Sequence, residues 1–241
     1  MHEVRRPILL AGEQDGRDFE FKIADAVLSR LRPKLASPFK QGVKRAFDIV
    51  VALLLVVVFA PLCLVVSLLV KRDGGPILFA HERVGRGGRI FKCLKFRTMV
   101  PDADKRLDEV LAGDPEAREQ WACMRKLKHD PRVTRIGAYL RATSIDELPQ
   151  LINVVIGDMS LVGPRPMVRG ELSAYESGEH ACYPLVRPGL TGLWQVSGRS
   201  HIPSEQRKHL DALYVRNWTL WGDVIILIRT IPAVIARHGA Y

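Results

Sequence analysis

The chain has 241 residues, of which 47% are apolar and 26% charged. That length predicts one domain with a real hydrophobic core, and the composition excludes a disordered chain and a coiled coil. A formal net charge of +10 favours an anionic partner such as lipid headgroups, nucleic acid or a phosphorylated small molecule. The basic residues are interleaved with acidic ones and form no recognised nucleic-acid module, so we expect no nucleic-acid partner.

The first 40 residues are polar and contain no signal-peptide pattern. We expect them to form an extension with one short helix near residues 24–31. The cysteines include no CxxC pair and have no histidine cluster beside them, which argues against a zinc site and a disulfide framework. A reducing compartment is therefore expected.

An uncharged apolar segment covers residues 49–70, with Lys44-Arg45 before it and Lys71-Arg72 after it. At about 1.5 Å per residue it is long enough to cross a bilayer core of roughly 30 Å. Hydropathy alone favours a single spanning helix. The basic pairs at both ends and Pro61 near the middle instead favour a segment that kinks and returns to the same side.

Beyond this segment the pattern becomes mixed. Residues 77–79 and 89–96 predict short strands around a glycine-rich turn at 85–88. A helix is expected from 102 to about 128, broken in two by Pro115. The last predicted helix, about 218–236, has an apolar stripe that suits either a core helix or a helix lying in the membrane interface.

Two adjacent carboxylates, Asp146 and Glu147, lie where the pattern predicts the start of a helix, because Pro149 is tolerated only in a first turn. One interpretation is structural: Ser144 and Glu147 match the spacing of a capping box. The other is functional, because a helix start favours anions and a carboxylate pair suits Mg²⁺. Both interpretations stay open on these residues alone.

Several arginines lie in rigid or glycine-rich loops, where a fixed guanidinium suits phosphate binding. Prolines flank Arg165 on both sides, although a surface arginine in a proline-rich loop would look the same. An acid pair with several arginines is what an enzyme acting on a pyrophosphate needs. The candidate phosphate ligands are Arg165, Arg141 and Arg187, whereas Arg199 and Asp211 either bind uridine or serve the fold.

Five motifs follow one another along the chain: KRAFD (44–48), FKCLKFRTM (91–99), DELPQLINV (146–154), GDMSLVGPRP (157–166) and RPGLTG (187–192). In this order they resemble the bacterial sugar transferases that act on polyprenyl phosphate, the monotopic phosphoglycosyl transferases. The resemblance covers Lys44 to about Trp218, which is most of the chain.

The resemblance implies an α-rich α+β fold with interfacial amphipathic helices. Residues 41–72 would form a re-entrant helix-break-helix anchor that breaks at Pro61, which reverses the preference from hydropathy. Residues 73–241 would form a cytoplasmic catalytic domain on the bacterial inner membrane, preceded by the extension at 1–40. The family often has serine before the break proline, where this chain has Ala60. Larger relatives carry further membrane helices upstream, so we expect a compact member.

The implied reaction moves a sugar-1-phosphate from a UDP-sugar to undecaprenyl phosphate and releases UMP, which initiates exopolysaccharide synthesis. Asp146 would attack the β-phosphorus and form a covalent aspartyl phosphosugar intermediate. Glu147 would bind Mg²⁺ together with Asp146 or assist proton handling, and Arg165, Arg141 and Arg187 would stabilise phosphoryl oxygens. The alternatives are a glycosyltransferase that releases UDP and a membrane-tethered anion-binding protein. The sugar (galactose, glucose or another) and homo-oligomer formation stay open.

Overall fold

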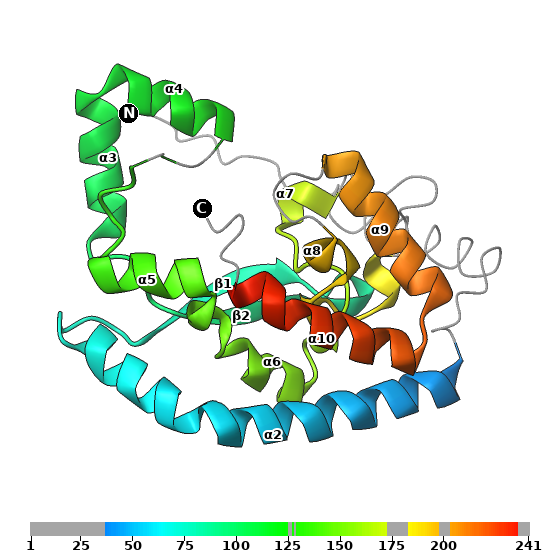
Figure 1. The fold of residues 1–241 in the computed structure, drawn as a ribbon. Helices are drawn as coiled ribbons and strands as arrows, with labels where there is room; N and C mark the ends of the chain where they lie inside the picture. The colour runs from blue at the N-terminus through cyan, green and yellow to red at the C-terminus, as the bar shows by residue number, and fades with distance from the viewer. Residues whose placement is uncertain (1–36, 125–126, 128, 173–182, 198–202, 236–241) are drawn as a thin grey trace, which may run out of the picture.

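A computed structural model describes residues 37–124, 127, 129–172, 183–197 and 203–235 (Figure 1). The helix expected near 24–31 and Arg199 lie outside these residues. The elements are α2 Pro38–Lys71, β1 Leu78–Val84, η2 Arg86–Gly88, β2 Ile90–Phe96, α3 Ala103–Gly113, α4 Pro115–Met124, α5 Arg135–Thr143, η3 Ile145–Glu147, α6 Gln150–Ile156, β3 Ser160–Val162, α7 Arg169–Leu172, η6 Tyr183–Leu185, β4 Gly189–Thr191, α8 Leu193–Val196, α9 Ser204–Asn217 and α10 Leu220–Ile235. The described fold is helix-rich, with a two-stranded antiparallel sheet and a two-stranded parallel sheet.

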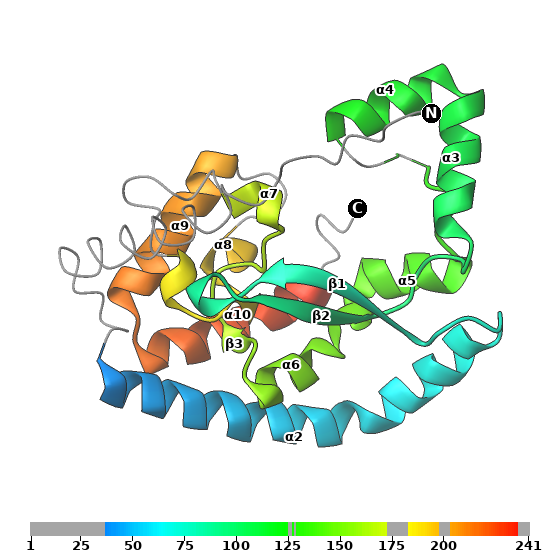
Figure 2. The same cartoon turned by 180° about the vertical axis from the view of Figure 1, so that it is seen from behind.

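Helix α2 is a single helix of 34 residues that continues through Pro61. The predicted division into two helices at this proline is therefore wrong, and Figures 1 and 2 show a curved helix instead. A proline removes one backbone donor, and a long helix can absorb that loss by bending while its other hydrogen bonds persist. Its most apolar 18-residue window has a mean hydropathy of 3.3, and 11% of that window is buried. It is the one helix in the described part of the chain that is long and apolar enough to cross a membrane.

The predicted strands and their turn are confirmed, although β1 is longer than expected. It pairs with β2 from Leu78 opposite Phe96 to Val84 opposite Ile90. In the turn, Gly87 and Gly88 have φ of +69° and +74°, a conformation that favours glycine.

Helix α6 is fixed to β2 by one side chain, that of Asn153. Its Oδ1 accepts from the backbone N–H of Leu94 at 3.0 Å, and its Nδ2 donates to the carbonyl of Lys92 at 2.9 Å. These bonds satisfy the backbone N–H of Leu94 and the carbonyl of Lys92, which would otherwise need water as a partner. The segment before α6, which carries Asp146, is therefore held in a fixed position against the hairpin.

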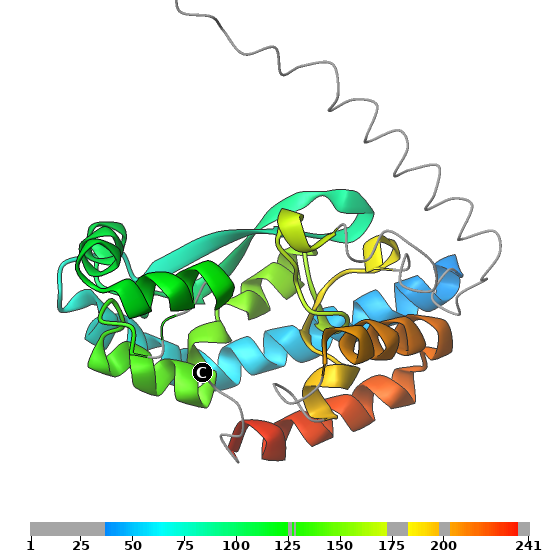
Figure 3. The same cartoon turned by 90° about the horizontal axis from the view of Figure 1, so that it is seen from above.

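The core surrounds α6. Figure 3 shows the hairpin and α10 on opposite sides of α2 and α6. Buried side chains from α6, β3, α9 and α10 form one cluster, which includes Leu151, Val154, Met159, Leu161, Val215 and Ile226. The predicted break at Pro115 is confirmed, because α3 ends at Gly113 and α4 starts at Pro115.

Helix α10 has two faces, in agreement with its predicted apolar stripe. Ile226 lies in the core, whereas Trp221, Ile225, Ile228 and Ile231 are exposed on the outward face. Core packing therefore uses one side of the helix, and the opposite apolar side stays exposed.

Helix α2 is attached to the domain by a buried ionic cluster, Lys44–Asp48–Asp223. The ammonium of Lys44 lies 2.8 Å from Asp48 Oδ1 and 2.9 Å from Asp223 Oδ2. The hydroxyl of Ser160 donates to Asp48 at 2.8 Å, and the indole N–H of Trp218 donates to Asp223 at 3.0 Å. This cluster gives the KRAFD motif a structural role, because it joins α2 to β3 and α10.

Candidate active site

Asp146 lies on the short 3₁₀ turn η3, between α5 and α6. Ser144, which precedes this turn, has φ of +57°, and its N–H donates to the carbonyl of Arg141. Its side chain makes no capping hydrogen bond, so the capping-box interpretation is wrong. The cause is that Ser144 ends α5 rather than starting the next helix, and α6 begins only at Gln150.

The carboxyl of Asp146 is buried, with 7% of the residue exposed, and it shares a lysine with Glu147. The Nζ of Lys95 lies 3.9 Å from Asp146 Oδ2 and 2.6 Å from Glu147 Oε1. Burial raises the pKa of Asp146 to about 6; the neighbouring carboxylate adds to this rise, and the positive charges of Lys95 and Arg141 oppose it. At neutral pH Asp146 is therefore mostly ionised yet poorly hydrated, as suits a nucleophile.

Arg141 lies on the last turn of α5, close to this carboxyl. Its Nε donates to the hydroxyl of Thr98 at 2.8 Å, which joins α5 to the end of the FKCLKFRTM motif. Its charge acts on Asp146, and its own pKa is lowered mainly by burial. The structure brings the charge of Arg141 close to the acid pair, and its role as a phosphate ligand stays a prediction.

One face of the hairpin continues the site away from Asp146. In the observed register Lys95, Cys93 and Phe91 lie opposite Phe79, His81 and Arg83, and paired residues share a face of an antiparallel sheet. The pKa of the Cys93 thiol is raised by burial, and four charges act on it as well. These charges belong to Lys95, Glu147, Arg83 and Arg165.

Arg165 therefore lies near the part of the hairpin that carries Cys93 and Arg83, although it is far from both in sequence. Its guanidinium lies 6.0 Å from the ring of Trp194, and that of Arg207 lies 5.0 Å from the same ring. Burial lowers the pKa of Arg83, and the charge of Arg165 lowers it further. Positive charge is thus present both near Asp146, from Lys95 and Arg141, and near Cys93, from Arg83 and Arg165, and such charge suits a diphosphate.

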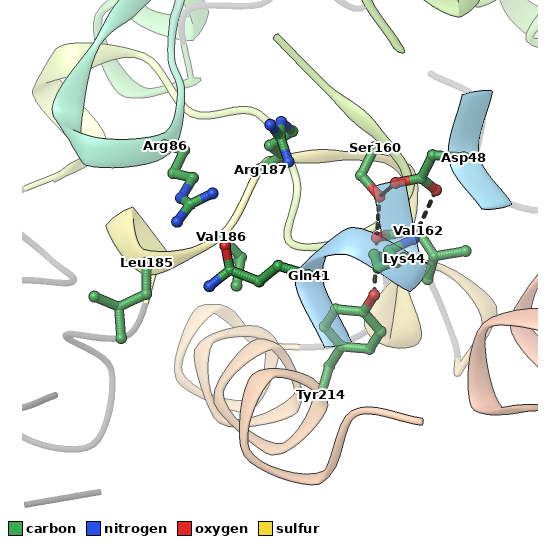
Figure 4. Close-up of a pocket in the computed structure, with 10 residues that line it drawn as sticks. All are labelled: Gln41, Lys44, Asp48, Arg86, Ser160, Val162, Leu185, Val186, Arg187 and Tyr214. Atoms are coloured by element: carbon green, nitrogen blue, oxygen red, sulfur yellow. Dashed lines mark hydrogen bonds and ion pairs between the residues drawn. The ribbon is translucent and has the colours of Figure 1, made fainter. Parts of the chain in front are cut away.

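Arg187 lies elsewhere, at the opposite end of α6 from Asp146. Its Nε donates to the carbonyl of Gly157 at 2.7 Å. It lines a cavity of about 30 Å³ beside Lys44 and Asp48, shown in Figure 4, with room for about one water molecule. Helix α6 alone separates the two ends by about 10 Å. The structure does not bring Arg187 to the acid pair, and its binding of phosphate stays a prediction.

Asp211 is buried in α9, with 4% of the residue exposed. Its Oδ1 has no hydrogen-bond partner among the described residues, and burial raises its pKa to about 8. The carboxyl is thus mostly neutral at pH 7. Its proposed contact with uridine stays a prediction, as does that of Arg199.

Sequence reasoning quoted Lys95 within a motif but gave it no role, and it missed Arg83 entirely. Both side chains project from strands onto the face that carries buried Cys93 and Phe91. A signal was present, because side chains alternate across a strand and Lys95 is two residues from Cys93. A charged residue on the core-facing side of a strand is a candidate site residue.

The acid pair fits a magnesium ion by its donor set. Mg²⁺ is usually held by one or two carboxylates together with substrate phosphates and water. Asp146 and Glu147 supply two carboxylates that already share one cation, Lys95. Among the residues that the structure describes, no group of three or more His, Cys, Asp or Glu side chains forms a larger metal cluster.

Comparison with known proteins matches residues 39–237 to the model of the bacterial sugar transferase family. The chain belongs to this family. It is 50% identical over 217 residues to a UDP-galactose-lipid carrier transferase of Erwinia amylovora, covering 90% of this chain and 45% of the relative. It is 49% identical over 199 residues to the exopolysaccharide production protein ExoY of Rhizobium meliloti, covering 82% of this chain and 88% of the relative.

A third family member is more distant. The UDP-glucose:undecaprenyl-phosphate glucose-1-phosphate transferase of Caulobacter vibrioides is 43% identical over 206 residues, covering 82% of this chain and 72% of the relative. The chain spans about half the length of several curated relatives, including those of Haemophilus influenzae, Erwinia amylovora and Salmonella typhimurium. The expected family resemblance is confirmed.

Proposed function

We propose that this sugar transferase moves a sugar-1-phosphate from a UDP-sugar to undecaprenyl phosphate and releases UMP. The step would begin the membrane phase of exopolysaccharide synthesis. The observation that carries the proposal is the buried carboxyl of Asp146, whose pKa is raised to about 6 beside Lys95 and Arg141. The names of the Erwinia and Caulobacter relatives support the same class of reaction.

In the first step a carboxylate oxygen of Asp146 bonds to the β-phosphorus of the donor. The bond from that phosphorus to the bridging oxygen breaks, and UMP leaves with that oxygen. The sugar phosphate is then held on Asp146 as an acyl phosphate. In the second step an oxygen of the lipid phosphate attacks the same phosphorus, which releases the carboxylate and gives the lipid diphosphate sugar. Asp146 and Glu147 would hold Mg²⁺, which would neutralise charge on the diphosphate.

The remaining residues act on charge and position. Lys95 keeps Asp146 ionised and faces the oxygens that gain charge when the phosphorus is attacked. Arg141, from α5, and Arg165, from the GPRP loop, bind phosphoryl oxygens. Arg187 is a weaker candidate for phosphate binding, and Arg199 and Asp211 are weaker candidates for uridine binding.

The membrane arrangement is part of the proposal. Helix α2 lies in the inner membrane as a bent, re-entrant helix, with both ends and the catalytic domain on the cytoplasmic face. Basic residues at both ends and the low burial of its apolar window support this arrangement. The exposed apolar stripe of α10 supports contact with the same surface. Such an anchor keeps the site at the depth of the polyprenyl phosphate. A hexose, galactose or glucose, is the preferred sugar.

The test is a nucleotide-release assay on the full chain with Mg²⁺, undecaprenyl phosphate and UDP-galactose, UDP-glucose or UDP-N-acetylglucosamine. We expect UMP from at least one donor and a loss of about 10³-fold or more in Asp146→Asn. The matched control is Asp108→Asn, an exposed carboxylate on α3, which should retain full activity. Release of UDP, or near-normal turnover in Asp146→Asn, would overturn the proposal. No release from any donor, with no donor binding by thermal shift, would favour an anion-binding protein.

A further inference from the structure

A second cavity lies away from Asp146, where the C-terminal end of α2 meets the N-terminal end of α5. Figure 1 shows the cyan end of α2 beneath α5. The cavity has a volume of about 190 Å³, the share of roughly six water molecules in the liquid. Leu69, Val70 and Ile136 give it apolar walls, and Arg72 and Arg135 are charged lining residues.

The charge of this cavity is unbalanced. Arg97 and Asp73 also line it and pair with each other, and the buried guanidinium of Arg97 further donates to the carbonyls of Val70, Pro76 and Met99. Arg72 and Arg135 are both exposed, and no ion pair is formed by either with the described residues. Two positive charges therefore face the cavity without a counterion from this part of the protein.

The backbone adds to the attraction for an anion. Helix α5 has nine residues, and Thr134 caps it by accepting from the N–H of Gly137 at 2.9 Å. The N–H groups of Arg135 and Ile136 in the first turn precede Ala138, whose N–H donates the first intrahelical bond, to the carbonyl of Thr134, and the positive end of the helix dipole lies there. The cap and the bonds of Arg97 hold both cavity walls in place before any ligand arrives.

The apolar surface leads from this cavity along α2. Leu68, Val65 and Leu64 are exposed on the turns that precede the cavity. A ligand with a phosphate between the two arginines could therefore lay an acyl chain along the helix, as a membrane phospholipid does. Inorganic phosphate would contact the two arginines and leave the apolar surface of α2 without a partner.

We propose that this cavity binds the headgroup of an anionic diacyl phospholipid, with its phosphodiester between Arg72 and Arg135 and one acyl chain along α2. The polyprenyl substrate is a poorer occupant, because α5 spans about 13 Å between this cavity and the segment that carries Asp146. The bound lipid fixes the depth of α5, and hence of η3, relative to the membrane surface. The proposal requires α2 to lie in lipid and is independent of the reaction that Asp146 performs.

Native mass spectrometry of the full chain in detergent tests this proposal with added dioleoyl phosphatidylglycerol. We expect one lipid to be retained per chain and its apparent affinity to fall about 30-fold in Arg72→Gln/Arg135→Gln, since each arginine contributes on the scale of a juxtamembrane charge. The matched control is Lys40→Gln/Lys71→Gln. It removes the same charge from exposed positions at the two ends of α2 that do not line the cavity, and it should change the affinity less than twofold.

Three outcomes would overturn the proposal. The first is an equal loss in both double variants, which means attraction to charge in general. The second is displacement of the lipid by millimolar inorganic phosphate, which means a free-anion site. The third is tighter retention of undecaprenyl phosphate than of phosphatidylglycerol, lost in the arginine variant, which means a substrate site. Recovery of affinity in Arg72→Lys/Arg135→Lys would support it.

Discussion

Two ionic clusters in this protein have the same formal composition, one lysine between two carboxylates, and different properties. In the first, Lys44 lies between Asp48 and Asp223, and all three residues are at most 6% exposed. In the second, Lys95 lies between Asp146 and Glu147, and the lysine and glutamate side chains remain 31% and 34% exposed. The first joins α2 to the domain, and the second is the candidate active site.

The difference lies in the hydrogen bonds that each carboxylate receives. Asp48 accepts from Lys44, the hydroxyl of Ser160 and the backbone N–H of Leu161. Asp223 has Lys44, Tyr214 and Trp218 as partners. Among the described residues, Asp146 has a lysine at 3.9 Å, a hydrogen bond from its own backbone N–H and the more distant charge of Arg141. A saturated carboxylate, one that accepts several hydrogen bonds, is held in place. A buried carboxylate with few donors has lone pairs that remain available to react.

Removing the lysine of the saturated cluster is expected to have the largest effect on stability. Lys44→Met leaves Asp48 and Asp223 buried without their cation, and breaking such a pair costs about 3–5 kcal/mol. We expect the midpoint of thermal unfolding in detergent to fall by about 10 °C. Adding Asp223→Asn to this variant should recover part of the loss, because one uncompensated charge is removed.

The same change at the open cluster is the control for this comparison. Lys95 is partly hydrated, so Lys95→Gln should change the free energy of unfolding by less than about 1 kcal/mol. Equal destabilisation by the two lysine variants would show that the clusters do not differ in kind.

Lys95→Gln is expected to act on catalysis instead, with a reduction of about 10- to 100-fold in turnover. It should also shift the pH dependence. Turnover needs the ionised carboxylate of Asp146, so the wild-type acidic limb is expected near pH 6, the pKa of that group. Lys95 lowers this pKa, and its removal raises it, so the limb of the variant should lie at higher pH. A pH profile of kcat/KM for the wild type and for Lys95→Gln measures the acidic limb of each. An unchanged acidic limb in the variant would exclude Lys95 as the group that sets the charge of Asp146.

The last prediction concerns Asp211, a buried carboxyl without a lysine. Burial raises its pKa to about 8, above the unfolded value of about 3.9, so the folded chain binds the proton more tightly. Its contribution to stability is therefore complete below about pH 4 and is lost as the pH rises to about 8. Asp211→Asn does not titrate and should unfold about 10 °C higher than wild type at pH 8, with near-equal midpoints at pH 4. Equal midpoints at pH 8 would mean that Asp211 has a partner in the folded protein.

Local sequence patterns predicted correctly those elements whose formation depends mainly on residues adjacent in the chain. The hairpin followed from two short apolar runs around glycines, and Pro115 separated α3 from α4 as expected. Pro61 was misjudged because the same local rule has two outcomes in a helix, a break or a bend. Ser144 was misjudged because its capping pattern competes with the C-terminal end of α5, which the sequence does not mark.

For the site, the sequence alone determined the candidate residues: Asp146 and Glu147 stood out as adjacent acids, and the motifs placed the chain in its family. Tertiary structure alone decided their surroundings. It brought Lys95 from β2 to the acid pair, placed Arg187 at the far end of α6, and put Asp48 and Asp223 on one lysine. The physical reason is that burial and charge depend on distances between segments far apart in the chain, and those distances set whether a carboxylate is structural or reactive.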